Sequence, residues 1–203
     1  MELSHSILIE VRGSFSVEME GLRREYSNLD WPGGVSEDEF DRDSVHVTAS
    51  VEGELAGMVR ITSRPLSVLS AWAVGQHHLP VGDDIVEATR GVVARKWRGI
   101  GLYKVLMAEV TRYCHRRQVA RIVAAIEPDF PHRRYLEGIG FRPVGPQSWF
   151  HNPPNGLTQC LVILQEPALA VGEASAALAV CIAKLGERGF SVHSSVLDVA
   201  LCG

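Results

Sequence analysis

The chain has 203 residues, of which 46% are hydrophobic and 22% are charged, and its formal net charge is −4. This composition is typical of a soluble globular protein with one large domain, and it excludes a largely disordered chain. The acidic balance argues against a protein that binds DNA or RNA through a general basic surface.

No metal site, disulfide framework or membrane segment is expected. Four cysteines are scattered through the chain without a C-x-x-C pair: Cys114, Cys160, Cys181 and Cys202. Residues 1–10 carry Glu2 and Glu10 without a basic lead, so they do not resemble a signal peptide. No apolar run reaches the roughly 18 residues that span a bilayer. We therefore expect a cytoplasmic protein.

The first part of the chain predicts a strand, a helix and a β-hairpin. Pro32-Gly33-Gly34 ends the helix, and an acidic loop follows at 36–43. Glu52-Gly53-Glu54 separates two β-rich runs and predicts a hairpin turn. The predicted elements are a strand at 6–11, a helix at 17–29 and strands at 45–51 and 55–62.

Strands and helices alternate in the middle of the chain. A loop at 63–83, with a short helix in it, precedes a strand pattern in which Gly91 predicts a β-bulge or a close backbone approach. Apolar residues at helical spacing begin at Leu102. The predicted elements are a strand at 84–93, a helix at 102–118, a strand at 119–126, a helix at 132–138 and strands at 141–144 and 157–164.

The segment after Pro167 carries no functional signal. It predicts an alanine-rich helix to about residue 185, a break at 186–189 and an apolar run at 191–201. We expect it to pack on the main domain, where it would cover a sheet edge or form a homodimer contact. The expected organisation is one domain at 1–166 with an extension at 167–203.

Residues 87–102, EATRGVVARKWRGIGL, carry the most chemical information. A strand that runs through a glycine-bearing loop into a helix directs backbone N–H groups and the helix dipole at one point. Such a point binds phosphate or pyrophosphate. Gly99 and Gly101 allow a close backbone approach, and Lys96 and Arg98 add positive charge.

This loop resembles the (Gln/Arg)-x-x-Gly-x-(Gly/Ala) signature of the GNAT (general N-acetyltransferase-like) superfamily, with Lys96 in place of the usual first residue. Gly140-Phe141 matches a later step of the family pattern, and the resemblance covers about residues 8–165. It implies an α/β (α+β) fold with a mixed, mostly antiparallel sheet, in which strands four and five splay around a pantetheine thioester. The donor-binding residues that it implies are Val92, Val93, Lys96, Arg98, Gly99, Ile100, Gly101 and Leu102.

Within this superfamily the chain is similar to the acyl-homoserine-lactone synthases and related N-acyl amino acid synthases. The matching residues are Arg23, Arg24, Trp31, Asp38, Asp41, Arg60 and the run Glu87-Ala88-Thr89-Arg90. A phenylalanine expected before Trp31 is missing, and the lactone synthases lack the loop glycines that this chain keeps. The resemblance implies Trp31, Arg60 and Arg90 as substrate-binding residues and leaves coenzyme A as a donor.

Each role has a structural alternative. Glu87 is the candidate base that deprotonates the amine, or a strand glutamate paired with Arg60 or Arg90. The two arginines bind an acceptor carboxylate, or they tie down the acidic loop through Asp38 and Asp41. Trp31 lines the acyl or acceptor pocket, or it is a packing anchor.

The general acid is the least defined role. The family often places a tyrosine four residues before the Gly140-Phe141 step, but Leu136 occupies that position here. Tyr135 lies one residue earlier, about 100° around the helix, and is the candidate acid.

These observations predict an N-acyltransferase that moves an acyl group from acyl-CoA or an acyl carrier protein to a small amino-acid-like amine. The alternatives are an autoinducer synthase, a GNAT protein that uses an aminoacyl-tRNA donor, and a non-catalytic thioester-binding domain. Four basic residues lie near the end of the predicted helix at 102–118: Arg112, Arg116, Arg117 and Arg121. They stabilise the C-terminus of that helix, or they form a docking patch for a carrier protein or tRNA.

Overall fold

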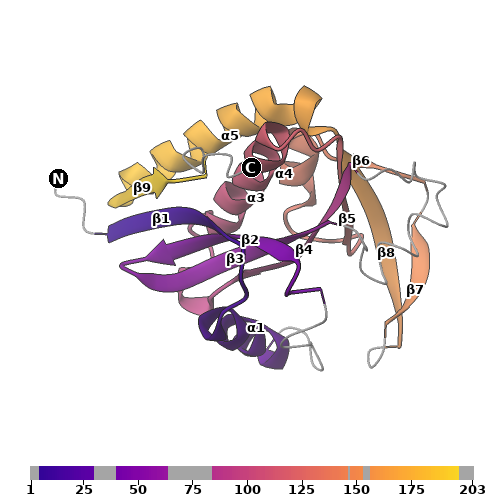
Figure 1. Cartoon of the computed structure of the whole chain (residues 1–203), viewed down its shortest axis with the longest axis horizontal. Coiled ribbons are helices and arrows are strands. Elements are labelled where there is room, and N and C mark those ends of the chain that lie inside the picture. Colours follow the sequence, from indigo (N-terminus) through magenta and orange to yellow (C-terminus); the bar gives the residue numbers. More distant parts are fainter. Residues whose placement is uncertain (1–4, 30–39, 64–83, 146, 153–155, 197–203) are drawn as a thin grey trace.

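A computed structural model of the chain describes residues 5–29, 40–63, 84–145, 147–152 and 156–196 (Figure 1). Within these residues a nine-stranded sheet runs in the order β6-β8-β5-β4-β3-β2-β1-β9, with β7 paired to β8. The strands are β1 (His5–Arg12), β2 (Ser44–Val51), β3 (Glu54–Thr62), β4 (Ile85–Val93), β5 (Arg121–Ile126), β6 (Arg142–Pro143), β7 (Ser148–Asn152), β8 (Gly156–Gln165) and β9 (Phe190–Ser194). Only the β4–β5 and β1–β9 pairs are parallel among the described strands, which confirms the predicted mixed, mostly antiparallel sheet.

Helices cover both faces of the sheet. The helical elements are α1 (Val17–Leu29), η1 (Arg95–Trp97), α3 (Leu102–Arg116), α4 (Arg133–Gly138) and α5 (Pro167–Glu187). Helix α1 lies on one face, whereas α3 and α5 lie together on the other (Figure 1). The predicted helices at 17–29, 102–118, 132–138 and 167–185 are therefore confirmed to within about two residues, the usual uncertainty of helix ends.

The two faces of the sheet differ in chemistry. On β2, Val47, Ala49 and Val51 belong to the apolar core that includes the inner face of α3. The alternate residues Ser44, His46, Thr48 and Ser50 are polar and are also buried. Because side chains alternate along a strand, these four point to the face that α1 covers. The part of the α1 face that β2 forms is therefore buried and polar, beside an apolar cluster that α1 makes with β3 and β4.

The sheet opens between β4 and β5. These strands pair only from Ile85 to Glu87 on β4, opposite Arg121 to Val123 on β5. Beyond that point β4 bulges, because its register with β3 shifts at Arg90 and Gly91. A Cβ on Gly91 would lie 2.8 Å from Tyr103 Cε2, which confirms the predicted close approach. The predicted splaying of these two strands is likewise confirmed.

The C-terminal segment completes the sheet and the helical layer. Helix α5 packs on α3 and buries Ala170, Ala174, Leu178 and Leu185. Strand β9 then pairs in parallel with β1, from His5 opposite Phe190 onward. The expectation that this segment covers a sheet edge is therefore confirmed.

One expectation about composition needs correction. Helix α5 is long and apolar enough to cross a membrane by length and composition alone, although no such segment was expected. Glu173 and Lys184 interrupt its apolar run in the sequence, but the 21-residue helix still passes that test. Only 22% of this window is buried, and the buried face packs on α3.

Candidate active site

The predicted phosphate loop connects β4 to α3. It passes through the 3₁₀ turn η1 and reaches the first residue of α3 by way of Gly99 and Gly101, whose φ angles are +80° and +102°. An L-residue is strained at these angles, so glycine is required for the path of the loop. Among the described residues, the N–H groups of Ile100, Gly101 and Leu102 donate to no backbone carbonyl. The arrangement therefore presents free donors and the positive end of a 15-residue helix, as an anion site requires.

The predicted donor residues around this loop are held in different ways. Arg98 Nε donates to the carbonyl of Val93 at 3.0 Å, which keeps the guanidinium beside the loop. Val92 is buried against α1 with Met19. Lys96 forms an ion pair with Glu54 on β3, so its ammonium lies on the β3 side of the loop. The structure thus places Arg98, but not the Lys96 ammonium, against the loop backbone.

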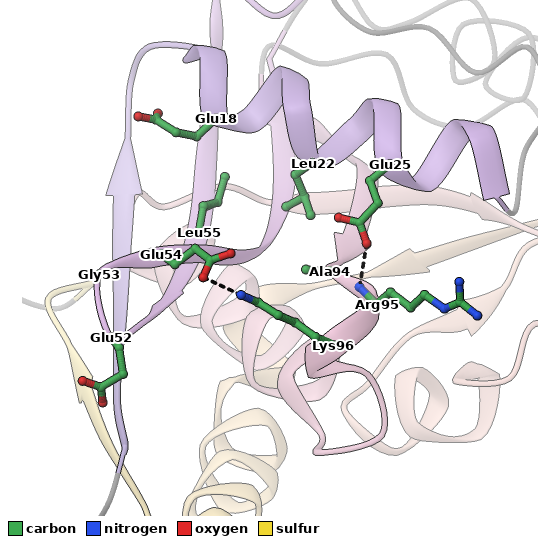
Figure 2. A pocket seen from close by; sticks show the side chains of 10 residues that line it. All are labelled: Glu18, Leu22, Glu25, Glu52, Gly53, Glu54, Leu55, Ala94, Arg95 and Lys96. Carbon is green, nitrogen blue, oxygen red and sulfur yellow. Dashed lines mark hydrogen bonds and ion pairs between the residues drawn. The ribbon is translucent and has the colours of Figure 1, made fainter.

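A pocket of about 880 Å³ lies between α1, the β2–β3 turn and the start of the loop (Figure 2). It is lined by Glu18, Leu22, Glu25, Glu52, Gly53, Glu54, Leu55, Ala94, Arg95 and Lys96. The lining carries four carboxylates and two cations, so the pocket is a poor environment for a polyanionic donor. Of the predicted site residues only Lys96 lines it. Sequence reasoning missed the pocket because its lining comes from three segments that are separate in the sequence.

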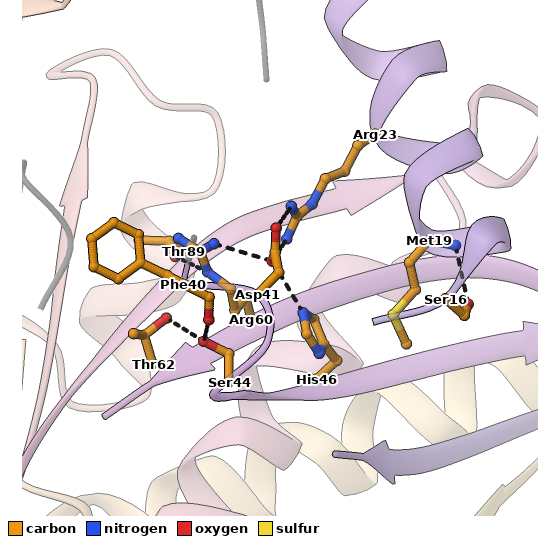
Figure 3. A network of polar contacts seen from close by, with 10 residues as sticks. All are labelled: Ser16, Met19, Arg23, Phe40, Asp41, Ser44, His46, Arg60, Thr62 and Thr89. Carbon is orange, nitrogen blue, oxygen red and sulfur yellow. Dashed lines mark hydrogen bonds and ion pairs between the residues drawn. The ribbon is translucent and has the colours of Figure 1, made fainter. Parts of the chain in front are cut away.

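A buried polar network occupies the α1 face (Figure 3). Both oxygens of Asp41 accept hydrogen bonds from Arg23 on α1, each at 2.6 Å. Arg60 Nη1 on β3 donates to the same carboxylate at 3.1 Å. His46 Nε2 lies 3.5 Å from an Asp41 oxygen, and neither ring nitrogen of His46 has a hydrogen-bond partner among the described residues. The Arg60–Asp41 contact fits the interpretation that this arginine ties down the acidic loop.

Arg90 belongs to the same charged region. Burial lowers the pKa of Arg23, Asp41 raises it, and the nearby positive charges of Arg60 and Arg90 lower it further. Arg60 Nε also donates to Thr89 Oγ1 at 3.2 Å. Arg90 has a φ of +53°, a left-handed conformation that costs about 1–3 kcal/mol in a non-glycine residue and occurs often at functional sites. The structure therefore places Arg60 against Asp41, with the charge of Arg90 near enough to act on Arg23.

Glu87 lies at the point where the sheet opens. It is fully buried, stands opposite Thr62 on β3 and Val123 on β5, and is the last β4 residue that pairs with β5. Side-chain alternation puts it on the same face as Thr89, which contacts Arg60. The structure thus brings the candidate base to the same face as Arg60, at the apex of the split between β4 and β5.

Tyr135 lies elsewhere. Its hydroxyl donates to the carbonyl of Lys104 on α3 at 2.7 Å, and the ring packs on the α3 side of the sheet. Burial raises the pKa of the Tyr135 hydroxyl, and the neighbouring Cys181 on α5 raises it further. The structure does not bring Tyr135 to the face that Glu87 shares with Arg60, so its role as general acid stays a prediction. Trp31 and Asp38 lie outside the described residues.

Comparisons with known proteins agree with this architecture. The sequence pattern of the Acetyltransferase (GNAT) family matches residues 9–141. The structure of the CoA-dependent acyl-homoserine lactone synthase BjaI, with SAM and isopentyl-CoA, is 19% identical with a TM-score of 0.63, covering 97% of this chain and 100% of that one. The acyl-homoserine lactone synthase LasI is 17% identical with a TM-score of 0.64, covering 84% of this chain and 93% of that one. The Escherichia coli ribosomal-protein-S18-alanine N-acetyltransferase is 10% identical with a TM-score of 0.57, covering 79% of this chain and 94% of that one.

No curated protein sequence matches the chain. The family pattern nevertheless spans about two thirds of the chain, from β1 through the β4–α3 loop to the start of the segment after α4. At these low identities the solved structures support the fold, and the family pattern supports the membership. The chain belongs to the acetyltransferase (GNAT) family, and it is an acyltransferase.

Proposed function

We propose that this acyltransferase moves an acyl group from a pantetheine thioester, acyl-CoA or an acyl carrier protein, to the amine of a small amino-acid-like acceptor. The observation that carries the proposal is the loop before α3. Its N–H groups at Ile100, Gly101 and Leu102 make no backbone hydrogen bond among the described residues. The phosphate of a pantetheine donor is the kind of group that such donors bind.

The opening between β4 and β5 supports the placement of the thioester. Beyond Glu87, β4 has no ladder partner on its β5 side among the described residues. Backbone groups left unpaired there need other hydrogen-bond partners, and the amides of a pantetheine arm can supply them. A donor held by its phosphate at the loop would extend along this edge toward Glu87.

The acceptor is assigned to the α1 face. The charge of Arg90 acts on Arg23 there, and a guanidinium can bind a carboxylate in a bidentate manner. Glu87, on the same face as Arg60, would accept a proton from the attacking amine. An acceptor with one amine and one carboxylate, such as an amino acid, matches this pair of charges.

The reaction forms one bond and breaks another. The deprotonated amine attacks the thioester carbonyl carbon, the C–N bond forms, and collapse of the tetrahedral intermediate breaks the C–S bond. Glu87 takes the proton that the ammonium loses before attack. The second proton, which the nitrogen sheds once the C–N bond has formed, passes to the leaving thiolate and makes it a thiol. Tyr135 is given no part in this scheme, because its hydroxyl donates to Lys104 of α3.

An acyl-homoserine lactone synthase is the second candidate. In its favour, the similarity to BjaI extends over 97% of this chain, beyond the region matched by the family pattern. Such an enzyme acylates S-adenosylmethionine and then closes a lactone. The intact glycine loop is the feature that counts against it.

The test is thiol release from acetyl-CoA and longer acyl-CoA thioesters with a panel of amino acids and S-adenosylmethionine. We expect turnover with an amino-acid-like amine and an N-acyl product by mass spectrometry. An acyl-homoserine lactone product would favour the second candidate, and coenzyme A binding without any turnover would favour a non-catalytic domain.

Replacing the candidate base should reduce turnover without affecting the binding of the donor. Glu87→Gln is expected to lower the acyl-transfer rate by about 10²–10⁴-fold, the usual contribution of general base catalysis, with coenzyme A binding retained. Glu109→Gln is the matched control, because Glu109 is equally buried but lies on α3. Equal rates for wild type and Glu87→Gln would contradict the role of Glu87.

A further inference from the structure

The C-terminal helix ends beside the phosphate loop. Arg188, the residue that follows α5, donates from Nη1 to the carbonyl of Gly99 at 3.1 Å, although the two are 89 positions apart. Backbone hydrogen bonds hold the turn that carries it. The N–H groups of Arg188 and Gly189 bond back to the last turn of α5, and the N–H of His5 on β1 donates to the Gly189 carbonyl at 3.2 Å. Arg188 thus projects from a turn that is fixed to both α5 and the sheet.

The contact with Gly99 controls the direction of an N–H group. The carbonyl of Gly99 and the N–H of Ile100 belong to one planar trans peptide, so they point in opposite directions. Gly99 has a φ of +80° and no Cβ, and a plane next to glycine rotates more easily than others. A hydrogen bond to the carbonyl fixes that plane. The Ile100 N–H is then directed away from Arg188, and it donates to no backbone carbonyl among the described residues.

The same segment braces the other end of the loop. The ring of Trp97 meets Phe190 of β9 edge-on, with a centroid separation of 6.2 Å and an interplanar angle of 82°. It meets His5 of β1 in a similar way at 6.2 Å and 70°. The residues after α5 therefore contact the loop both at Trp97 and at Gly99.

We propose that Arg188 is a positioning residue for the donor: it holds the Gly99–Ile100 peptide so that the Ile100 N–H is presented to the donor phosphate. This role rests on the proposed function, because it requires the loop to bind a phosphate-bearing donor. It also gives the segment after residue 166 a part in the site, although that segment lies outside the family match at 9–141. The exposed side chain of Arg188 has no core packing to lose when it is replaced.

The test compares coenzyme A with pantetheine, which lacks the pyrophosphate, by isothermal titration of the full chain. Arg188→Gln is expected to weaken coenzyme A binding by roughly three- to tenfold, the effect of losing one hydrogen bond. Its affinity for pantetheine should equal that of the wild type. In ¹⁵N spectra, the shift of the Ile100 amide on addition of coenzyme A should shrink in the variant.

Arg117→Gln is the matched control. It removes the same charge from an exposed arginine at the opposite end of α3, about 22 Å away along the helix, and it should leave coenzyme A binding unchanged. Equal binding of coenzyme A by wild type and Arg188→Gln would overturn the role of Arg188 alone. Equal weakening of coenzyme A and pantetheine would overturn it too, because the effect would not act through the phosphates. No binding by the wild type would overturn the proposed function and this role with it.

Discussion

At the scale of single residues, the polar network on the α1 face depends on one carboxylate. Asp41 is fully buried and accepts hydrogen bonds from Arg23 and Arg60, which are also buried. Desolvating these groups is costly, and the contacts offset that cost only while the network is complete. Asp41 therefore links α1 to β3 and holds Arg60 in place.

Removal of this carboxylate should destabilise the fold. Asp41→Asn leaves two arginines buried without their counter-charge, and we expect the free energy of unfolding to fall by about 3–5 kcal/mol. Urea denaturation followed by circular dichroism measures the change. Asp43→Asn is the control, because Asp43 lies two residues away and is exposed, and it should change stability by less than about 0.5 kcal/mol. A small effect of Asp41→Asn would show that the arginines find other partners.

The residue scale is also where sequence reasoning was least complete. The Arg60–Asp41 contact matches one of the two interpretations that the sequence left open. His46 carried no signal, because a lone histidine on a strand looks like any other strand residue. Its burial beside Asp41 follows from the pairing of β2 with β3, where His46 stands opposite Arg60. Such cross-strand neighbours depend on register, which a single sequence specifies poorly.

At the scale of elements, α5 packs on α3 through one face. Its inner face buries Ala170, Ala174, Leu178 and Leu185, and its partner is α3. Because α3 begins at the phosphate loop and α5 ends at Arg188, the packing of these two helices also sets the geometry around Gly99. The stability of α5 and the order of the loop should therefore be linked.

Truncation of a buried α5 side chain should reveal this packing. Leu178 is 4% exposed, and Leu178→Ala is expected to lower the free energy of unfolding by about 2–5 kcal/mol. Val180→Ala, on the outer face with the valine 54% exposed, should cost less than about 0.5 kcal/mol. Chemical denaturation of the two variants side by side measures the difference. Similar values for both would mean that α5 does not pack on α3 as described.

Elements with a local signal were predicted well, and elements that depend on a distant partner were not. The β2–β3 turn and the bulge at Gly91 could be predicted because glycine marks them within the sequence. Strand β7 was missed, since its pairing with β8 is what makes it a strand. The predicted strand at 119–126 begins at Arg121 instead. The N–H of Val119 donates to the carbonyl of Cys114 on α3, and the N–H of Ala120 donates to the carbonyl of Asp84, just before β4. The loop at 63–83 lies almost entirely outside the described residues.

At the scale of the whole molecule, the two sides of the sheet differ, because buried polar residues gather on the α1 side beside a small apolar cluster. The apolar side packs on α3 and α5 and supplies most of the core, whereas the polar side contains Glu87, Arg60 and Asp41. The opening between β4 and β5 has Glu87 at its apex, and the phosphate loop lies beyond the end of β4. This arrangement lets one fold hold a donor by its phosphates and expose its thioester to an acceptor on the polar face.

Isothermal titration with coenzyme A shows whether the loop before α3 binds the phosphates of a coenzyme A-type donor. The variant is Gly99→Asp, which places a carboxylate where the phosphate would bind. Gly53→Asp is the control, because Gly53 has the same φ of +80° and the same open surroundings but lies in the β2–β3 turn. We expect micromolar binding by wild type and Gly53→Asp, and a loss of at least about 100-fold in affinity, or about 2.7 kcal/mol, in Gly99→Asp. Equal binding by all three proteins would contradict this role of the loop, as would failure of the wild type to bind coenzyme A.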